Sequence, residues 1–165
     1  MLSHVYRLAT EVDAEAIFQV IDQAYESIRE LGIAFRAAHA TIEMVTENIV
    51  HNACYILEIN GSIAATLSLK SLEELTDLPF LYWFAVQPAY KNQGIGNLLI
   101  TYVEEVVIRD TLLATGVVLA TSVKHPWLLA MYERKGYERF HQRALGDDDT
   151  LVYLKKALIP QTQLV

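Results

Sequence analysis

Cysteine is almost absent from this chain of 165 residues. Cys54 stands alone, so neither a disulfide within the chain nor a thiolate-rich zinc site can form. It lies in the apolar run at residues 53–57 and is expected in the core rather than as a nucleophile. We predict no metal, because the histidines are scattered without the spacing of ligands. They are His4, His39, His51, His125 and His141.

Positive charge and long apolar runs are also scarce. Lys and Arg total 13 against 20 Asp and Glu, which gives a formal net charge of −7 at pH 7. This balance argues against a nucleic-acid partner, which needs a basic face, and is compatible with a cationic small molecule or peptide as substrate. Apolar runs are too short to span a membrane, and residues 1–7 carry no apolar signal segment. We expect a cytoplasmic protein without a membrane partner; no segment marks an interface, so monomer and homodimer both stay open.

Apolar residues are abundant, at 53% of the chain. In 165 residues this content is enough for one sizeable core. Internal repeats, low-complexity segments and linkers do not divide the sequence. We therefore predict a single domain over residues 1–165.

The stretch from residue 80 to residue 110 organises the chain. Residues 80–86 form an aromatic-rich apolar run typical of a buried strand, and Pro88 ends it. A polar loop with Gly94 and Gly96 follows. Apolar residues then recur at helical spacing, with Asn97, Glu104, Glu105 and Arg109 on the opposite face. The apolar set is Ile95, Leu98, Leu99, Tyr102, Val103, Val106 and Val107.

A strand, a glycine loop and a helix in this order suggest an anion site. Free N–H groups and the helix dipole attract phosphate at a helix N-terminus, and Lys91 adds a positive charge. A Walker loop is excluded because Asn97 and Leu98 stand where it needs Lys and Ser or Thr. A dinucleotide fingerprint is excluded because Leu99 replaces its third glycine. The pattern therefore predicts a phosphate or pyrophosphate site of another kind.

The remaining segments predict an α+β fold. Strands are expected at residues 3–8, 53–59, 62–70, 116–123, 137–145 and 150–157. Helices are expected from Asp13, as its cap, to Glu30, from Thr41, and from Pro126, as the first helical position, to Gly136. The Asn60-Gly61 dipeptide predicts a hairpin. A strand–helix–strand crossover makes the strand at 116–123 parallel to the strand at 80–86.

Two segments resemble the GNAT superfamily of N-acetyltransferases. Residues 86–99, from Val86-Gln87-Pro88 through Gly94-Ile95-Gly96, closely resemble its Gln/Arg-x-x-Gly-x-Gly/Ala loop, with Lys91 where the family has Gln or Arg. Residues 130–137, Ala-Met-Tyr-Glu-Arg-Lys-Gly-Tyr, resemble its second signature. The first half of the chain matches as an order of elements rather than as a motif.

This resemblance implies a mixed, mostly antiparallel central sheet of six to seven strands, about four helices, and a splayed parallel pair at 80–86 and 116–123. Acetyl-CoA would lie in the split, its pyrophosphate on backbone amides between Lys91 and Gly96, and its pantetheine arm along residues 84–86. The cofactor-binding residues so implied are Phe84, Ala85, Val86, Lys91, Asn92, Gln93, Gly94, Ile95, Gly96, Asn97, His125 and Tyr132.

The implied reaction is direct attack of a primary amine on the thioester. Tyr132 occupies the family position of the general acid that protonates the leaving thiolate, and a backbone N–H on the central strand would bind the oxyanion. His125 stands where many members have asparagine, and could contact the cofactor, act as a base, or merely cap the next helix. Phe80 stands where histone-type members carry a glutamate base. The substitutes are Glu58, Glu73, Glu74, His125 and His141, or a chain of waters.

The acceptor would be bound by residues 31–40, with Arg36 and His39, and by the last hairpin. The run Asp147-Asp148-Asp149 could attract a cationic acceptor such as a polyamine, although a solvated turn is the better explanation of such a run. Two functions remain open. The chain is either an acetyl-CoA-dependent N-acetyltransferase acting on a small molecule or peptide, or a non-catalytic acyl-CoA-binding sensor on the same fold.

Overall fold

The computed structural model describes residues 3–33, 35–125 and 127–159, and a seven-stranded mixed sheet forms its centre. The strand order is β1-β2-β3-β4-β5-β7-β6, and β4 and β5 are the parallel pair. The strands are β1 (His4–Leu8), β2 (Ala53–Ile59), β3 (Ser62–Lys70), β4 (Phe80–Val86), β5 (Gly116–Ser122), β6 (Glu138–Ala144) and β7 (Thr150–Ala157). The fold predicted from the sequence is thereby confirmed.

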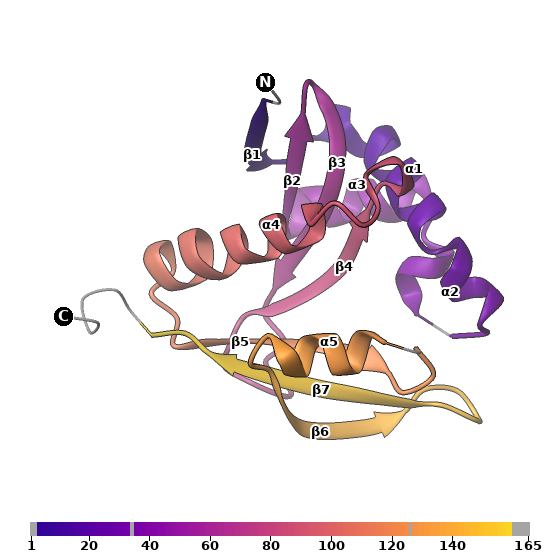
Figure 1. The fold of residues 1–165 in the computed structure, drawn as a ribbon, viewed down its shortest axis with the longest axis vertical. Helices are drawn as coiled ribbons and strands as arrows, with labels where there is room; N and C mark the ends of the chain where they lie inside the picture. The colour runs from indigo at the N-terminus through magenta and orange to yellow at the C-terminus, as the bar shows by residue number, and fades with distance from the viewer. Residues whose placement is uncertain (1–2, 34, 126, 160–165) are drawn as a thin grey trace.

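The sheet is divided between β4 and β5. These strands share a single residue pair, Phe80 with Val118, and then diverge, as Figure 1 shows. By contrast, the β3–β4 and β5–β7 pairings on either side extend over most of each strand. Beyond Phe80, the edge of β4 that faces β5 is therefore not paired with that strand, and it borders the space between the two parts of the sheet.

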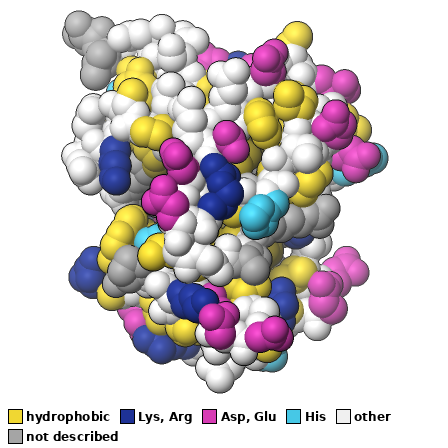
Figure 2. Space-filling model, turned by 90° about the vertical axis from the view of Figure 1, so that its right-hand side faces the viewer, with side chains coloured by type: hydrophobic (Ala, Val, Ile, Leu, Met, Phe, Trp, Pro, Cys, Tyr) yellow, Lys and Arg dark blue, Asp and Glu magenta, His cyan; other side chains and the backbone are white. Residues whose placement is uncertain are grey.

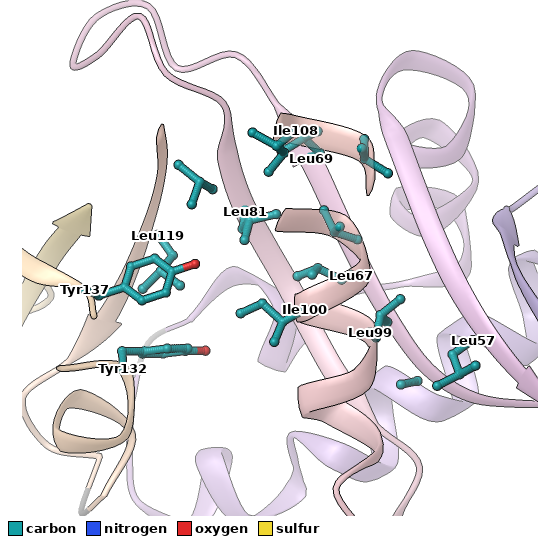
Figure 3. Close-up of a cluster of buried hydrophobic side chains, with 14 of the residues drawn as sticks. Leu57, Leu67, Leu69, Leu81, Leu99, Ile100, Ile108, Leu119, Tyr132 and Tyr137 are labelled. Atoms are coloured by element: carbon teal, nitrogen blue, oxygen red, sulfur yellow. The ribbon is translucent and has the colours of Figure 1, made fainter. Parts of the chain in front are cut away.

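Helices cover both faces of the sheet (Figure 1). On one face α1 and α3 pack against β2 and β4, and on the other α4 and α5 pack against β3 and β5. The second of these cores surrounds the labelled leucines of Figure 3. The helical segments are η1 (Glu11–Asp13), α1 (Ala14–Ala24), α2 (Glu26–Glu30), η2 (Arg36–His39), α3 (Ile42–His51), η3 (Pro88–Tyr90), α4 (Ile95–Tyr102), η4 (Val103–Thr111) and α5 (Leu128–Arg134).

Local sequence explains several of the turns. Asn60 and Gly61 both have positive φ, 51° and 84°, as a tight hairpin of the right twist requires. Gly136, at φ +100°, ends α5: its N–H donates to Glu133 O and the N–H of Tyr137 to Tyr132 O. This is a Schellman ending, in which the Tyr132 and Tyr137 rings make the accompanying contact.

The long first helix predicted over residues 13–30 is interrupted. It consists of α1 and α2, with Tyr25 between them at φ −92° and ψ 6°. Asp13 occupies the N-cap position of α1, as predicted, but its side chain does not cap the helix. The Asp13 side chain makes no cap bond to α1, because its carboxylate pairs with Arg7 at 2.9 Å and accepts the N–H of Thr10.

In the helix after the glycine loop, some residues lie on the opposite face from the one predicted. From Val103 onward it is a π-helix, so its residues no longer follow the period of an α-helix. Glu104, predicted on the polar face, is buried and accepts hydrogen bonds from Tyr137 Oη at 2.5 Å and Lys156 Nζ at 3.0 Å. Val106, predicted on the apolar face, is exposed.

Two predictions fall outside the described residues: Pro126 as a first helical position, and the tail beginning at Pro160. In the part of the chain that the structure describes, no helix has the length and apolar character to cross a membrane. No group of three or more potential ligand side chains is gathered for a metal there either.

Candidate active site

A cavity of about 570 Å³ opens in the split between β4 and β5. Its walls come from the α1–α2 junction, β4, the loop before α4, β5 and α5. The volume lies within the range of ordinary small-molecule sites. Figure 2 views the molecule from the side of α2 and the β6–β7 turn, where acidic, basic and apolar side chains are interspersed. The split in the sheet thus contains a cavity of suitable size for a small molecule, and most of the residues named from the sequence line it.

The glycine loop brings the start of α4 against β4. Gly94 caps the helix in the left-handed conformation at φ +74°, which favours glycine. A Cβ on Gly96 would lie 3.0 Å from both Phe84 Cζ and Val86 Cγ2. Gly94 therefore permits the turn, and Gly96 permits the close approach of the helix to the strand.

The loop offers hydrogen-bond donors and positive charge to the cavity. The first amide of α4 bonded within the helix is that of Leu98, to Gly94 O, which leaves the N–H groups of residues 95–97 without such acceptors. Lys91 lines the cavity, and Lys135 does so too while donating to Asn97 Oδ1. Gln93 is not among the lining residues, and its side-chain amide donates to Ala89 O at 3.3 Å. This donor set suits an anion of the phosphate class.

The other cavity residues named from the sequence are also brought together. Those that line it are Phe84, Ala85, Val86, Lys91, Asn92, Gly94, Ile95, Gly96, Asn97, His125 and Tyr132. Strand β4 carries an irregularity at this point: Trp83 has φ +52°, and the β3–β4 register shifts between Thr66 and Ser68. The cavity wall on β4 is therefore a bulged strand rather than a regular one.

Tyr132 faces the cavity from α5. It is 6% exposed, and its hydroxyl makes no hydrogen bond to any other described residue. Its ring packs edge-on against Tyr137 with centroids 5.7 Å apart, and Figure 3 shows both hydroxyls directed from the β5 side toward α4. Burial raises the pKa of Tyr132 above its usual value of 10.0, so the phenol holds its proton at neutral pH. The side chain can therefore donate to an acceptor atom in the cavity.

His125 is arranged as a cap and a donor. Its Nδ1 accepts the N–H of Leu128 at 3.2 Å, at the start of α5. The neutral ring then carries its proton on Nε2 and has no free lone pair with which to act as a base. Burial lowers the pKa of His125, which keeps the ring neutral near pH 7. Of the roles considered for His125, capping together with donation to a ligand fits this geometry best.

The other base candidates do not line the cavity. Glu58 is held by Arg7, whose Nε lies 2.8 Å from its carboxylate, and His141 packs against the ring of Tyr153. Glu73 and Glu74 lie in the loop between β3 and β4. The sequence interpretation did not name Glu26 and Glu30, two exposed carboxylates of α2 that line the cavity.

The triple aspartate does not form a free acidic patch. Asp148 pairs with Lys124 at 2.7 Å. Asp149 is buried, and it accepts hydrogen bonds from the Ser122 hydroxyl and from the N–H of Thr150. None of Asp147, Asp148 and Asp149 is among the cavity residues. The structure thus favours the simple turn over attraction of a cationic acceptor.

Further cavity residues could not be named from the sequence alone. Thr121 on β5 is buried, and its Oγ1 is the buried side-chain polar atom that lacks a hydrogen-bond partner within the described residues. Tyr25 reaches the cavity from the α1–α2 junction and donates to Phe84 O at 2.9 Å. Trp127, 54% exposed, stands against His125 at the rim. An orphan hydroxyl facing a cavity fits a ligand that carries amide groups.

Comparison with known proteins identifies the class. A model of the Acetyltransferase (GNAT) family matches residues 15–137, so the chain belongs to the GNAT family of acetyltransferases. It is 46% identical over 157 residues to the S-(2-succino)cysteine N-acetyltransferase of Bacillus subtilis strain 168, covering 93% of this chain and 95% of that protein. It is 41% identical over 166 residues to the S-alkylcysteine N-acetyltransferase of the same strain, covering 98% and 93%.

Solved structures agree on the fold. The PaiA N-acetyltransferase of Thermoplasma acidophilum, solved in complex with coenzyme A, aligns with a TM-score of 0.76 at 14% identity, over 94% of this chain and 99% of that one. At this identity the likeness concerns the fold alone. The chain is an N-acetyltransferase that acts on an amine, as its relatives of 46% and 41% identity are, and the non-catalytic sensor considered from the sequence is set aside.

Proposed function

We propose that this enzyme transfers the acetyl group of acetyl-CoA to the α-amino group of an S-substituted cysteine. The observation that carries the proposal is a pair of relatives named for N-acetylation of S-(2-succino)cysteine and S-alkylcysteine, at 46% and 41% identity and aligned over more than nine tenths of this chain. The acceptor in this proposal is therefore a small molecule, a neutral or acidic derivative of an amino acid. A cytoplasmic location and a monomeric or homodimeric state remain predictions from the sequence.

The cavity supports both halves of this reaction. The N–H groups at residues 95–97, with Lys91, would hold the pyrophosphate of acetyl-CoA, and the backbone of residues 84–86 would hold its pantetheine arm. Bound acetyl-CoA supplies an activated thioester. The Tyr132 hydroxyl would then donate its proton to the departing sulfur.

The absence of a carboxylate from strand β4 is consistent with an α-amine. The α-amino group of an amino acid is less basic than a lysine-type amine, whose pKa is about 10.4. Much more of an α-amine is therefore neutral near pH 7, and loss of its remaining proton needs less assistance. No carboxylate lies on β4 between Phe80 and Val86, which suits such an acceptor better than an alkylamine.

Aromatic side chains could bind the S-substituent. Phe35, Trp83 and Trp127 all line the cavity. Thioether sulfur makes favourable contacts with aromatic rings, and an alkyl group gains from leaving water. This lining provides a reason to prefer a substituted sulfur over a free thiol.

A panel of acceptors tests the proposal. With acetyl-CoA as donor, kcat/KM for S-methylcysteine and S-(2-succino)cysteine should exceed that for free cysteine by about tenfold or more, because pocket contacts of this size contribute about 1–3 kcal/mol. Free cysteine carries a thiol of its own, which a thiol reagent does not distinguish from released CoA. The acetylated product is therefore quantified by mass spectrometry. Spermidine serves as the cationic control. Equal or better turnover of spermidine would contradict the proposed acceptor class.

Thr121 provides a test of acetyl-CoA binding. The Thr121→Val change removes a buried hydroxyl that has no partner in the described protein and keeps the shape of the side chain. The free protein should gain about 1 kcal/mol of stability, while the Kd for CoA should rise by up to about tenfold through loss of one hydrogen bond. Denaturant unfolding and isothermal titration measure these opposite changes.

The matched control for Thr121 is Thr66→Val. Thr66 is equally buried, but its hydroxyl donates to Tyr55 O at 3.2 Å and it does not line the cavity. This variant should lose stability and bind CoA normally. If Thr121→Val left CoA affinity unchanged, the orphan hydroxyl would not be a ligand contact.

A further inference from the structure

Tyr25 links the first helical pair to the centre of the sheet. It stands where α1 ends and α2 begins, and its side chain enters the split between β4 and β5. There its hydroxyl donates to Phe84 O at 2.9 Å. Burial, and secondarily the nearby Tyr132 phenol, raise the pKa of Tyr25, so the hydroxyl keeps the proton that it donates. Two tyrosines thus reach the same cavity, one from the α1–α2 junction and one from α5.

The carbonyl that Tyr25 holds belongs to the bulge of β4. Thr66 pairs with Ala85 and Ser68 with Tyr82, so that Leu67 alone opposes both Trp83 and Phe84. Trp83 adopts φ +52°, a conformation that costs a non-glycine residue about 1–2 kcal/mol. Such a conformation persists only where surrounding contacts hold it. The hydrogen bond from Tyr25 to the carbonyl of Phe84, the residue after Trp83, is one of these contacts.

The orientation of Phe84 determines where its N–H points. In an extended residue the N–H and the C=O face the same edge of the strand. The Phe84 carbonyl faces Tyr25 in the split, and β5 pairs with β4 only at Phe80. The Phe84 N–H is therefore directed toward the cavity, where a thioester oxygen can accept from it.

We propose that Tyr25 is a positioning residue for acetyl transfer, which holds the Phe84 carbonyl and thereby aims the backbone N–H of Phe84 at the thioester oxygen. The role rests on the proposed use of acetyl-CoA, but it does not depend on the identity of the acceptor amine. It assigns a function to a residue outside both motifs that resemble the family. Tyr25 stands at the interruption between α1 and α2, and from there its side chain enters the split.

The test is the Tyr25→Phe variant, which removes one oxygen atom and keeps the ring. We expect kcat to fall about 10- to 100-fold, the range for a misdirected oxyanion donor, with the KM for acetyl-CoA changed by less than about twofold. Tyr55→Phe is the matched control, because Tyr55 is a half-buried tyrosine outside the cavity. Thermal unfolding of both variants shows that the fold is kept.

A spectroscopic readout separates positioning from a general structural effect. Acetyl-CoA labelled with carbon-13 at the thioester carbonyl is bound to each protein, and the carbonyl stretch is measured by isotope-edited infrared spectroscopy. The wild type should show a lowered frequency, and Tyr25→Phe should move it toward that of free acetyl-CoA. This measurement needs no acceptor, so it remains decisive even if S-substituted cysteines prove not to be substrates. An unchanged carbonyl frequency, or a rise only in the KM for the acceptor, would overturn the proposal.

Discussion

Replacing Tyr132 with phenylalanine should lower kcat by about a hundredfold and change the Kd for CoA by less than about twofold. A positioned general acid typically contributes factors of this size. The Tyr132 hydroxyl faces the cavity without a partner in the described protein, whereas its ring is held by Tyr137. Phenylalanine keeps the ring contact and removes only the proton donor. Steady-state kinetics and isothermal titration of CoA measure the two parameters separately.

The Tyr132 prediction has a matched control and a pH signature. Tyr55→Phe makes the same change outside the cavity and should leave kcat within about twofold of wild type. Burial raises the pKa of Tyr132, so the phenol stays protonated and able to donate through pH 9. We therefore expect no loss of kcat from Tyr132 up to that pH. A Tyr132→Phe enzyme that keeps most of its kcat would show that the sulfur is protonated by another group.

Substituting valine for Gly94 should weaken acetyl-CoA binding by about 5- to 30-fold. Gly94 has φ +74°, which a β-branched residue adopts only at a cost of about 1–2 kcal/mol. To relieve that strain the loop must turn, and the N–H groups of residues 95–97 turn with it. A built Cβ at Gly94 meets nothing within 4 Å, so the expected effect is conformational rather than a steric clash. Isothermal titration with CoA gives the change in Kd directly.

The Gly61→Val variant is the control that separates the effect of backbone strain on stability from its effect on CoA affinity. Gly61 has φ +84° in the β2–β3 turn, also with nothing within 4 Å of a built Cβ, and it lies outside the cavity lining. Both variants should lose a similar free energy of unfolding, but only Gly94→Val should lose affinity for CoA. If Gly94→Val bound CoA as tightly as Gly61→Val does, the loop would not be the phosphate site.

Much of the fold followed from short-range signals. Asn60 and Gly61 predicted the hairpin because few residue pairs tolerate two positive φ angles. Gly136 predicted the end of α5 for the same reason. The parallel pairing of β4 with β5 followed from the crossover through the helix between them. The family resemblance added the split at this pair, which local patterns do not predict.

Other features depend on contacts between segments distant in the sequence. The inward turn of Glu104 requires the π-helix and two partners, Tyr137 just after α5 and Lys156 on β7. The bulge at Trp83 depends on the register against β3, and the role of Tyr25 depends on that bulge. No periodicity in the sequence carries this information, because hydrophobic patterns identify a buried face but not the partner of a buried hydroxyl.

The sequence named Tyr132 and the glycine loop as parts of one site, and both line the same cavity; their roles there stay predictions. The sequence alone did not distinguish between the roles considered for His125, which were cofactor contact, base and helix cap. The deciding observation is the hydrogen bond from the N–H of Leu128 to Nδ1, which depends on the backbone path between the two residues. Thr121 gave no sequence signal at all, since an orphan hydroxyl is recognised only when its neighbours are known.

The most direct test of the account is to identify the product formed from acetyl-CoA and S-methylcysteine. Purified enzyme, both substrates and a thiol reagent would be combined, and the product analysed by tandem mass spectrometry and NMR. The account predicts one acetyl group on the α-nitrogen, formed in equal amount to the CoA released and lost in step with activity in Tyr132→Phe. CoA binding without any N-acetylated S-substituted cysteine, or acetylation that persists unchanged in Tyr132→Phe, would contradict it.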